Sequence, residues 1–178
     1  MDYPSKNSEE AHDELANRIF FRLYQCANML HKTGSRAVEP LGLTTQQWAV
    51  LGALSRPETQ GGVGVGELAR YLMVSRQNLS GLVSRMERDG HIELAADPLD
   101  RRSRLVRMTQ EGGRVWREDA PELIRGFYDM ALANFSVGDM AHLLHYLLKL
   151  LDNMQAIDKA SGAGEDSDAE PPSKSKGQ

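Results

Sequence analysis

The sequence predicts a mainly α-helical protein with a small β-wing, in which helices before and after a central unit form a dimer. The central unit spans residues 66–112, where a short helix, a tight turn and a longer helix are followed by two short strands and an arginine-rich loop between them. That order of elements is typical of a winged helix-turn-helix. Segments with helical apolar periodicity flank the unit, and each has an apolar stripe that needs another surface.

The second helix of the central unit has two chemically different sides. At helical spacing, Leu79, Leu82 and Met86 fall on one side. Ser75 precedes the helix and is a preferred N-cap residue. The other side and its edges carry small residues and hydrogen-bond donors, the mixture that a helix in the major groove of DNA needs. We therefore predict DNA contacts from Ser75, Arg76, Gln77, Ser80, Ser84, Arg85 and Arg88.

The two predicted strands, residues 91–94 and 105–108, alternate apolar and polar side chains as short strands do. Arginines stand at the tip of the hairpin between them, where they suit the negative potential of the minor groove. Asp100 is expected to hold a neighbouring guanidinium by a hydrogen-bonded ion pair. Residues 63–65 are predicted to add a third strand to the wing. The predicted DNA contacts of the wing are Asp100, Arg101, Arg102 and Arg104.

The charge of the chain is unevenly distributed. Between Arg70 and Arg107 eight arginines stand against five acidic residues, a formal charge of +3, whereas the whole chain carries −4. A basic island on an acidic protein favours binding to nucleic acid. The alternative is a winged-helix module that binds protein without DNA, with these charges as a solvated face. Steep salt dependence of duplex binding separates the two, because neutralised phosphates release counterions.

The flanking segments give the expected domain organisation. Residues 1–10 are expected to be a flexible N-terminus, 11–40 a dimerisation helix, 41–108 the DNA-binding domain, 109–158 dimerisation helices and 159–178 a disordered tail. Thr44 with Gln47 is predicted to form a capping box, and Thr109 to cap the helix that follows the wing. Pro121 predicts a kink or a break within that helix. A monomeric helical cap is the alternative to a two-fold dimer on a palindromic site.

Composition excludes several classes of function. The single cysteine, Cys26, rules out an internal disulfide framework and is compatible with a reducing cytoplasm. No apolar run is long enough for a membrane span, so a soluble cytoplasmic protein is expected. Asp139, His142 and His145 could share a helix face and bind a metal, but a polar edge of a dimer helix is the preferred interpretation. No pattern for catalysis or for a cofactor is found, so an enzyme is not expected.

The segment around the wing resembles the MarR family of bacterial transcription regulators. The family pattern of Asp-Pro, Asp-x-Arg, a hydrophobic strand, Leu/Met-Thr and Gly is matched within residues 97–112. Residues 43–54 and 66–90 are similar to the helices that precede the wing in that family, and the resemblance covers about residues 11–157. It implies a dimeric transcription regulator. Peroxide-sensing members carry a reactive cysteine where this chain has Phe20, so Cys26 is interpreted as a small core residue.

The resemblance also implies a ligand site between the dimer helices and the DNA-reading lobe. Many members bind small aromatic acids there, so a repressor of aromatic-compound catabolism or efflux genes, released by such an acid or its coenzyme A thioester, is expected. Arg18 and Arg22 stand at i and i+4 and repel unless Glu14 or a bound carboxylate neutralises them. The candidate ligand contacts are Arg18, Arg22, Tyr24, His31 and Trp48, with Trp116 as a further aromatic candidate.

Overall fold

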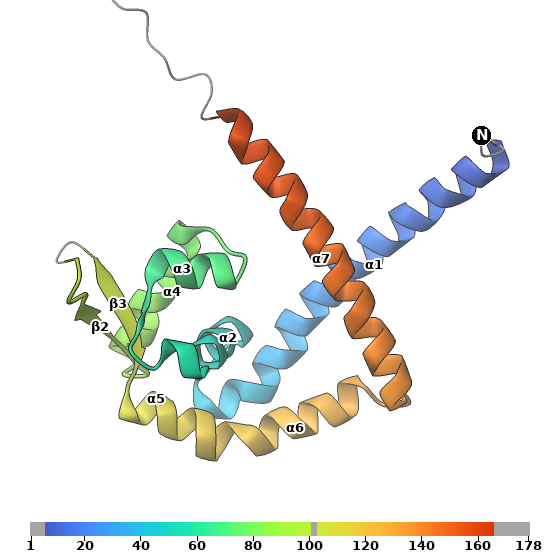
Figure 1. Ribbon diagram of the computed structural model, residues 1–178. Helices are drawn as coiled ribbons and strands as arrows, with labels where there is room; N and C mark the ends of the chain where they lie inside the picture. Colours follow the sequence, from blue (N-terminus) through green and yellow to red (C-terminus); the bar gives the residue numbers. More distant parts are fainter. Residues whose placement is uncertain (1–5, 101–102, 166–178) are drawn as a thin grey trace, which may run out of the picture. The chain divides into compact units, whose positions relative to one another are not determined.

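The computed structural model describes residues 6–100 and 103–165 (Figure 1). The chain forms two units, residues 1–131 and 132–178. The second unit contains one long helix, α7 (Val137–Glu165). The first unit is helical apart from a small sheet, as the sequence predicts. Its helices are α1 (Lys6–Val38), η1 (Glu39–Leu41), α2 (Thr45–Leu54), η2 (Pro57–Thr59), α3 (Val65–Tyr71), α4 (Arg76–Arg88), α5 (Gln110–Arg114), the π-helix η3 (Val115–Asp119) and α6 (Ala120–Ala131).

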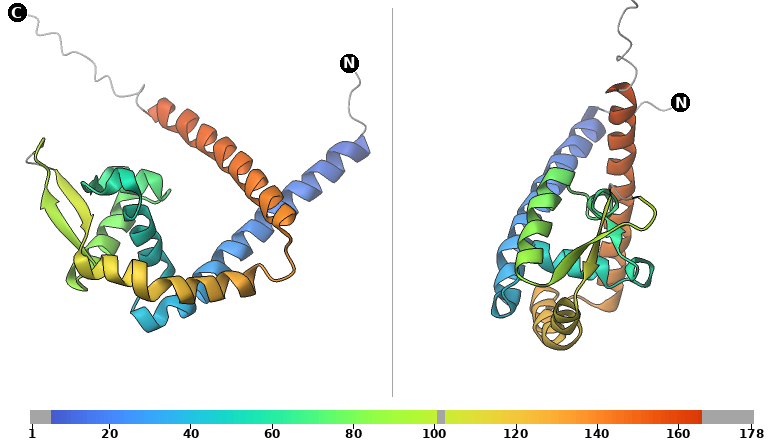
Figure 2. Two further views of the ribbon diagram at one scale, coloured as in Figure 1. Left: turned by 60° about the horizontal axis from the view of Figure 1, so that its bottom comes forward. Right: turned by 90° about the vertical axis from the view of Figure 1, so that its left-hand side faces the viewer.

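A three-stranded antiparallel sheet with the order β1-β3-β2 forms the wing. Its strands are β1 (Val63–Gly64), β2 (Ile92–Ala96) and β3 (Arg104–Met108). Val63 and Leu94 both pair with Val106, so β3 is the central strand. The β2–β3 hairpin extends away from helices α2 to α4 (Figure 2). The predicted third strand is confirmed, except that Val65 already belongs to α3.

The core of the first unit lies where α2, α3 and α4 meet the sheet. Leu51, Leu68 and Met86, one from each of these helices, are completely buried, and Val106 contributes from β3. Burial of one such side chain stabilises the fold by roughly 1.5–3 kcal/mol. Because three helices and the sheet share these contacts, the orientation of α4 is fixed relative to the wing.

Helix ends follow the predicted caps. The Thr44 hydroxyl accepts from the Gln47 N–H at 3.3 Å, and the Gln47 side chain accepts from the Thr44 N–H at 2.8 Å. The Thr109 hydroxyl accepts from the Gly112 N–H at 3.0 Å. Each bond satisfies a backbone donor that a helix start leaves without an intrahelical partner. The capping box and the Thr109 cap are confirmed.

The helix after the wing is interrupted just before Pro121. Residues 115–119 form a π-helix, and α6 begins at Ala120. Proline has no N–H and its ring clashes with the carbonyl group four residues earlier, so an ordinary helix cannot run unchanged through this position. Of the predicted kink or break, the structure shows a π-helical segment between α5 and α6, and the helical residues continue from 110 to 131 without a gap.

The structure corrects the predicted ends of the two longest helices. Helix α1 begins at Lys6, so a flexible N-terminus over residues 1–10 is wrong for residues 6–10. Helix α7 continues to Glu165, so a disordered tail from residue 159 is wrong for residues 159–165. Both extensions are polar segments without an apolar stripe, and they continue a helix that has already formed, for which propagation is less costly than nucleation. The remaining residues of both predicted segments, 1–5 and 166–178, lie outside the described residues.

Long stretches of α1 and α7 present apolar side chains to solvent. On α1, Ile19 and Phe21 are 55% and 61% exposed. Cys26 is exposed as well, so its interpretation as a core residue is wrong for a single protomer. On α7, Leu144 and Tyr146 are 58% and 63% exposed. None of the described helices is long and apolar enough to cross a membrane.

Asp139 completes the cap at the start of α7. Its carboxylate accepts from the N–H and the hydroxyl of Ser136, at 2.9 and 2.7 Å, and these bonds hold the pKa of Asp139 below its ordinary value. The Ser136 hydroxyl oxygen accepts in return from the Asp139 N–H at 3.1 Å. This carboxylate therefore has a structural partner in Ser136, whereas its spacing from His142 and His145 in the sequence also allowed a metal site. Within the described part of the chain, no three acidic, histidine or cysteine residues gather to hold a metal.

Candidate DNA-binding surface and ligand cavity

The turn between α3 and α4 sets the position of the recognition helix. Met73 adopts a left-handed conformation with φ +55°, and the Val74 N–H donates to the Ala69 carbonyl at 3.1 Å. Ser75 then has extended backbone angles, and its hydroxyl accepts from the Asn78 N–H at 3.2 Å. Ser75 is thus the N-cap of α4, as predicted. The turn delivers α4 at a fixed angle to α3, which is the arrangement of a helix-turn-helix.

Helix α4 buries one side and exposes the other. Leu79, Val83 and Met86 are at most 2% exposed and pack into the core. The predicted DNA contacts all lie on exposed positions of this helix or at its cap. They are Ser75, Arg76, Gln77, Ser80, Ser84, Arg85 and Arg88. The exposed side is therefore free for contacts outside the protomer.

The two serines of this surface already donate hydrogen bonds within the helix. The Ser80 hydroxyl donates to the Arg76 carbonyl at 2.8 Å, and the Ser84 hydroxyl donates to the Ser80 carbonyl at 3.0 Å. Each hydroxyl oxygen can still accept a hydrogen bond. In this conformation each serine hydroxyl can accept a hydrogen bond from a base amino group, and the serine side chain occupies little space. The hydrogen-bond donors of this surface are therefore the longer side chains.

Arg76 folds back over the start of α3. A side chain at Gly66 would meet the Arg76 guanidinium, so the absence of a Cβ at Gly66 leaves the space that Arg76 occupies. The guanidinium consequently lies at the junction of α3 and α4.

The described part of the wing loop is held by short-range bonds. The Asp97 carboxylate accepts from the Leu99 N–H at 2.8 Å, and the Asp100 carboxylate accepts from the Ser103 hydroxyl at 2.7 Å. Arg104 donates to the Leu94 carbonyl at 3.3 Å, which places its guanidinium beside β2. The predicted contacts Arg101 and Arg102, and with them the expected ion pair from Asp100, lie outside the described residues.

Arg107 contributes to the basic island but has a structural role. Its Nε donates to the Gly61 carbonyl at 2.9 Å, and its side chain packs against Gly62, whose φ is +95°. Arg107 thereby joins β3 to the loop that precedes β1. A count of charges along the sequence cannot separate such an arginine from one that faces DNA.

The five candidate ligand contacts do not line one cavity within a protomer. Arg18 lies 3.9 Å from Glu14, and Arg22 donates to Gln25 at 2.8 Å. Both arginines, with Tyr24, are on the exposed N-terminal part of α1. His31 lies nine residues beyond Arg22, which is about 13 Å along a helix, and lines a groove together with Trp48. The ligand role of all five remains a prediction.

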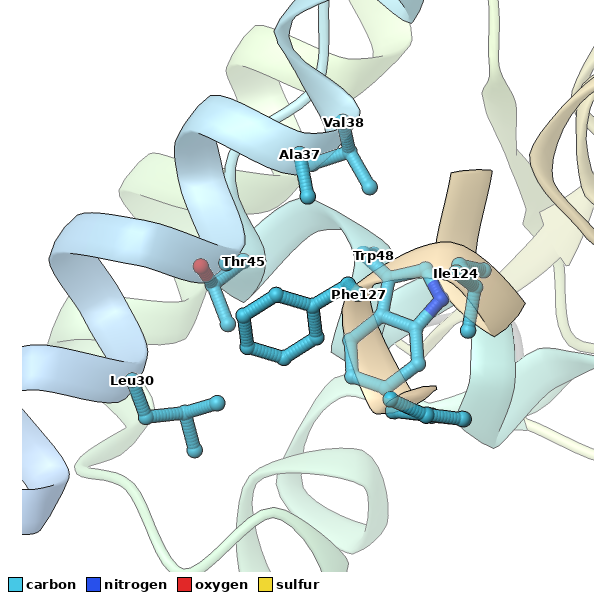
Figure 3. A pocket seen from close by; sticks show the side chains of 9 residues that line it. Leu30, Ala37, Val38, Thr45, Trp48, Ile124 and Phe127 are labelled. Carbon is cyan, nitrogen blue, oxygen red and sulfur yellow. The ribbon is translucent and has the colours of Figure 1, made fainter. Parts of the chain in front are cut away.

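An apolar cavity of about 210 Å³, here called the aromatic cavity, lies between α1, α2 and α6 (Figure 3). Among the residues that the structure describes, none that lines it is charged. Trp48 meets Tyr128 edge to face at 6.4 Å between ring centroids, and partial burial raises the pKa of the Tyr128 hydroxyl. The lining residues are Leu30, Gly34, Ala37, Val38, Thr45, Trp48, Ile124, Phe127 and Tyr128.

Of the residues that line this cavity, the sequence predicts only Trp48 as a ligand contact. Phe127 and Tyr128 on α6 are not predicted, although two adjacent aromatic residues are a visible signal in a chain with 6% aromatic residues. Their partners on α1 are more than 80 positions away in sequence, so only the packing of α6 against α1 brings them together. The Trp48 Nε1 is buried and has no hydrogen-bond partner among the described residues.

A second hollow, here called the α4 groove, adjoins the aromatic cavity. It has a volume of about 680 Å³ and shares Leu30, Thr45 and Trp48 with that cavity. Its other walls include His31 and the α4 residues that face α2. The two hollows therefore border the same three side chains, and the recognition helix lines the second of them.

A capped, exposed and polar second helix, with an arginine-bearing β-hairpin beside it, defines a DNA-binding protein of the winged helix-turn-helix class. The sequence model of the MarR family matches residues 41–103. Transcriptional activatory protein BadR of Rhodopseudomonas palustris is 64% identical over 159 residues, which cover 89% of this chain and 90% of that protein. The chain belongs to the MarR family of transcription regulators.

Two further relatives extend this finding. The homoprotocatechuate degradative operon repressor of Escherichia coli is 31% identical over 106 residues, 59% of this chain and 68% of that protein. The solved structure of the M. tuberculosis transcriptional regulator MOSR in complex with DNA matches with a TM-score of 0.66 and 27% identity, over 77% of this chain and 96% of that one. The winged-helix architecture predicted from the sequence is thus confirmed.

Proposed function

We propose that the protein is a homodimer that binds a palindromic operator in duplex DNA and responds to a small aromatic acid or to the coenzyme A thioester of such an acid. One observation carries the DNA-binding part of this proposal. Helix α4 buries Leu79, Val83 and Met86 and exposes only polar or small residues on its other side. A regulator that binds chromosomal DNA works in the cytoplasm, and no enzymatic activity is part of the proposal.

The exposed side chains divide into two roles. Gln77 and Arg88 are long enough to reach base edges, where glutamine pairs with adenine and arginine with guanine. Ser80 and Ser84 accept from base amino groups. Arg76 and Arg85 contact phosphates, which position the helix without reading sequence. The wing arginines, above all Arg102, lie in or against the minor groove, whose narrow stretches attract guanidinium groups.

The exposed apolar faces of α1 and α7 support the dimer. Apolar surface that is removed from water contributes roughly 25 cal/mol per Å², and side chains such as Ile19, Phe21 and Leu144 remain more than half exposed in a single protomer. Pairing of two chains would cover them. A two-fold dimer also presents two α4 helices to half-sites about 34–36 Å apart on a palindromic operator.

The aromatic cavity supports the nature of the effector. Apolar cavities of about 150 Å³ are known to bind benzene, so a cavity of about 210 Å³ has enough volume for an aromatic ring. One relative is named for the degradation of homoprotocatechuate, itself an aromatic acid. The effector must bind the state that does not fit the operator more tightly than the state that does, since equal affinity shifts no population.

Repression, with release by the effector, is the regulation that the sequence predicts. The relatives bear both an activatory name and a repressor name. A reporter gene behind the protein's own promoter decides between the two outcomes: expression that rises when the regulator is deleted indicates repression, and expression that falls indicates activation.

The test of DNA binding is fluorescence anisotropy on duplex DNA from upstream of the protein's own gene, over a range of salt concentrations. For each phosphate that the protein neutralises, the logarithm of the binding constant falls with the logarithm of salt concentration by a slope of about 0.9. Arg102→Ala should weaken binding and reduce that slope by about one, while Arg102→Lys should retain the slope. Binding without salt dependence would support a protein-interaction module. Unchanged affinity of Arg102→Ala would remove the wing from the proposal.

A further inference from the structure

Gly81 lies in the interior of the recognition helix α4 and is exposed. Glycine weakens a helix interior relative to alanine, because it has more conformational freedom to lose on folding. The described glycines with positive φ are Gly42, Gly62 and Gly90, so the backbone at position 81 does not call for glycine. A Cβ added to Gly81 would meet no atom of the described residues within 4 Å. Neither the conformation nor the packing of the described protomer therefore requires glycine at this position.

Other helical glycines of the chain have a reason inside the protomer. A Cβ at Gly52 on α2 would lie 3.1 Å from the ring of Trp116. A Cβ at Gly112 on α5 would collide with the carbonyl oxygen of His91. Gly81 has no such neighbour among the described residues, so the space in front of it is open to a molecule outside the protomer.

The position of Gly81 on α4 indicates which molecule this is. The side of α4 opposite its buried residues consists of Gln77, Gly81, Ser84 and Arg88. Gly81 also borders the α4 groove. The Ser84 hydroxyl donates to the Ser80 carbonyl at 3.0 Å, which holds this short side chain against the helix. The surface that faces DNA is therefore lowest at Gly81, and longer side chains stand before and after it.

The chemistry of this low point selects one group on a base edge. Gly81 offers only C–H bonds, because the backbone N–H and carbonyl groups in the interior of a helix are already paired. A base donor or acceptor placed there would lose a water partner without gaining a protein partner, which is unfavourable. The apolar group that base edges present in the major groove is the C5 methyl of thymine.

We infer that Gly81 accommodates the C5 methyl of a thymine in the operator and thereby contributes to base specificity. The helix gives up the stability of alanine at this position and gains a close approach to that base. This inference rests on the proposed role of α4 as the helix that reads DNA.

Fluorescence anisotropy of the full-length protein on synthetic duplexes tests the inference. The reference duplex comes from upstream of the protein's own gene, and a random duplex of equal length measures non-specific binding. Further duplexes replace one thymine at a time, with its symmetry mate, by uracil, which removes the methyl group and keeps the hydrogen-bonding edge. Gly81→Ala adds a methyl group to the protein. Gly126→Ala is the matched control, because Gly126 is also an exposed helical glycine with no described atom within 4 Å of an added Cβ.

We expect both alanine variants to melt at a higher temperature than the wild type, by roughly 2–4 °C. Only Gly81→Ala should lose affinity for the reference duplex, by roughly ten-fold, which is the size of the loss from one poorly fitting base pair. Its affinity for the random duplex and its salt dependence should stay as in the wild type, because no phosphate contact is removed. One uracil position should restore most of the lost affinity, because the alanine methyl then takes the space of the thymine methyl.

Four outcomes would overturn the inference. Unchanged affinity of Gly81→Ala for the reference duplex would show that DNA does not approach this position. Equal losses on the reference and random duplexes would indicate a contact with the DNA backbone, and a loss that no uracil position relieves would exclude a thymine methyl. A lower melting temperature of Gly81→Ala would show that the fold itself needs the glycine.

Each of these outcomes leaves α4 as the DNA-reading helix. Wild-type protein that binds the reference duplex no more tightly than the random duplex would contradict the proposed function together with this inference.

Discussion

Gly112 lies where the wing meets the helix that follows it, and its replacement by alanine is expected to destabilise the protein. Gly112 is buried in α5, and a Cβ there would collide with the main-chain carbonyl oxygen of His91. That oxygen cannot move freely, because it accepts from the Thr109 N–H at 3.1 Å. A Cβ would also lie 3.2 Å from the Met108 side chain. An added Cβ would therefore meet the backbone of His91 on one side and the Met108 side chain, which packs against the core, on the other.

The expected loss in the free energy of unfolding follows from these contacts. Overpacking costs roughly 1–3 kcal/mol, and a weakened Thr109–His91 hydrogen bond costs about 1 kcal/mol more. The helix propensity of alanine over glycine offsets about 1 kcal/mol. A net loss of about 2 kcal/mol corresponds to a melting temperature lower by roughly 4–8 °C for a chain of this size.

Thermal unfolding followed by circular dichroism, at equal protein concentration for all variants, measures this loss. Gly126→Ala is the control, because Gly126 is exposed in α6 and nothing lies within 4 Å of a Cβ built there. This control should gain up to about 1 kcal/mol. A Gly112→Ala protein that melts at or above the wild-type temperature, while Gly126→Ala shows its gain, would refute the close approach between α5 and the wing.

Further predictions concern the caps of two helices. Ser75→Ala removes the N-cap of α4 and should lower the free energy of unfolding by about 1 kcal/mol in a urea titration; Ser75→Thr should retain most of it, and equal losses would argue against the cap. Asp139→Ala should lower the melting temperature at pH 7. Since bonds from Ser136 hold the pKa of Asp139 below its ordinary value, the wild-type carboxylate stabilises the fold above about pH 4 and loses this effect as the pH falls through its lowered pKa. The difference between wild type and Asp139→Ala should therefore shrink at pH 3, and a difference that does not change with pH would contradict this account.

The features that the sequence predicts correctly depend on interactions between residues that are close together in the chain. The cap at Ser75, the capping box at Thr44 and the apolar spacing of α4 depend on residues within one or two turns of each other, so their signals are complete in the sequence. The glycine at 112 was recognised only as part of a family pattern, and the structure supplies its physical reason in the close approach to His91.

The ligand site was harder to predict, because its walls come from distant parts of the chain. Phe127 and Tyr128 reach the aromatic cavity only through the packing of α6 on α1. Arg85 lines a groove and also belongs to the recognition helix, and the pattern of α4 alone indicates only the second of these roles. The spacing of Arg18 and Arg22 predicts a carboxylate contact, yet within one protomer these arginines lie apart from His31 and Trp48, on the exposed part of α1.

The most direct test of the central claim is an operator-release titration. Fluorescence anisotropy would follow the wild-type protein on duplex DNA from upstream of its own gene while aromatic acids and their coenzyme A thioesters are added. The account predicts tight binding, weakened at high salt, that one of these compounds reverses. Binding no tighter than to a random duplex would contradict the assignment of α4 and the wing as a DNA-reading surface. Tight binding that none of the compounds disturbs would contradict the effector site.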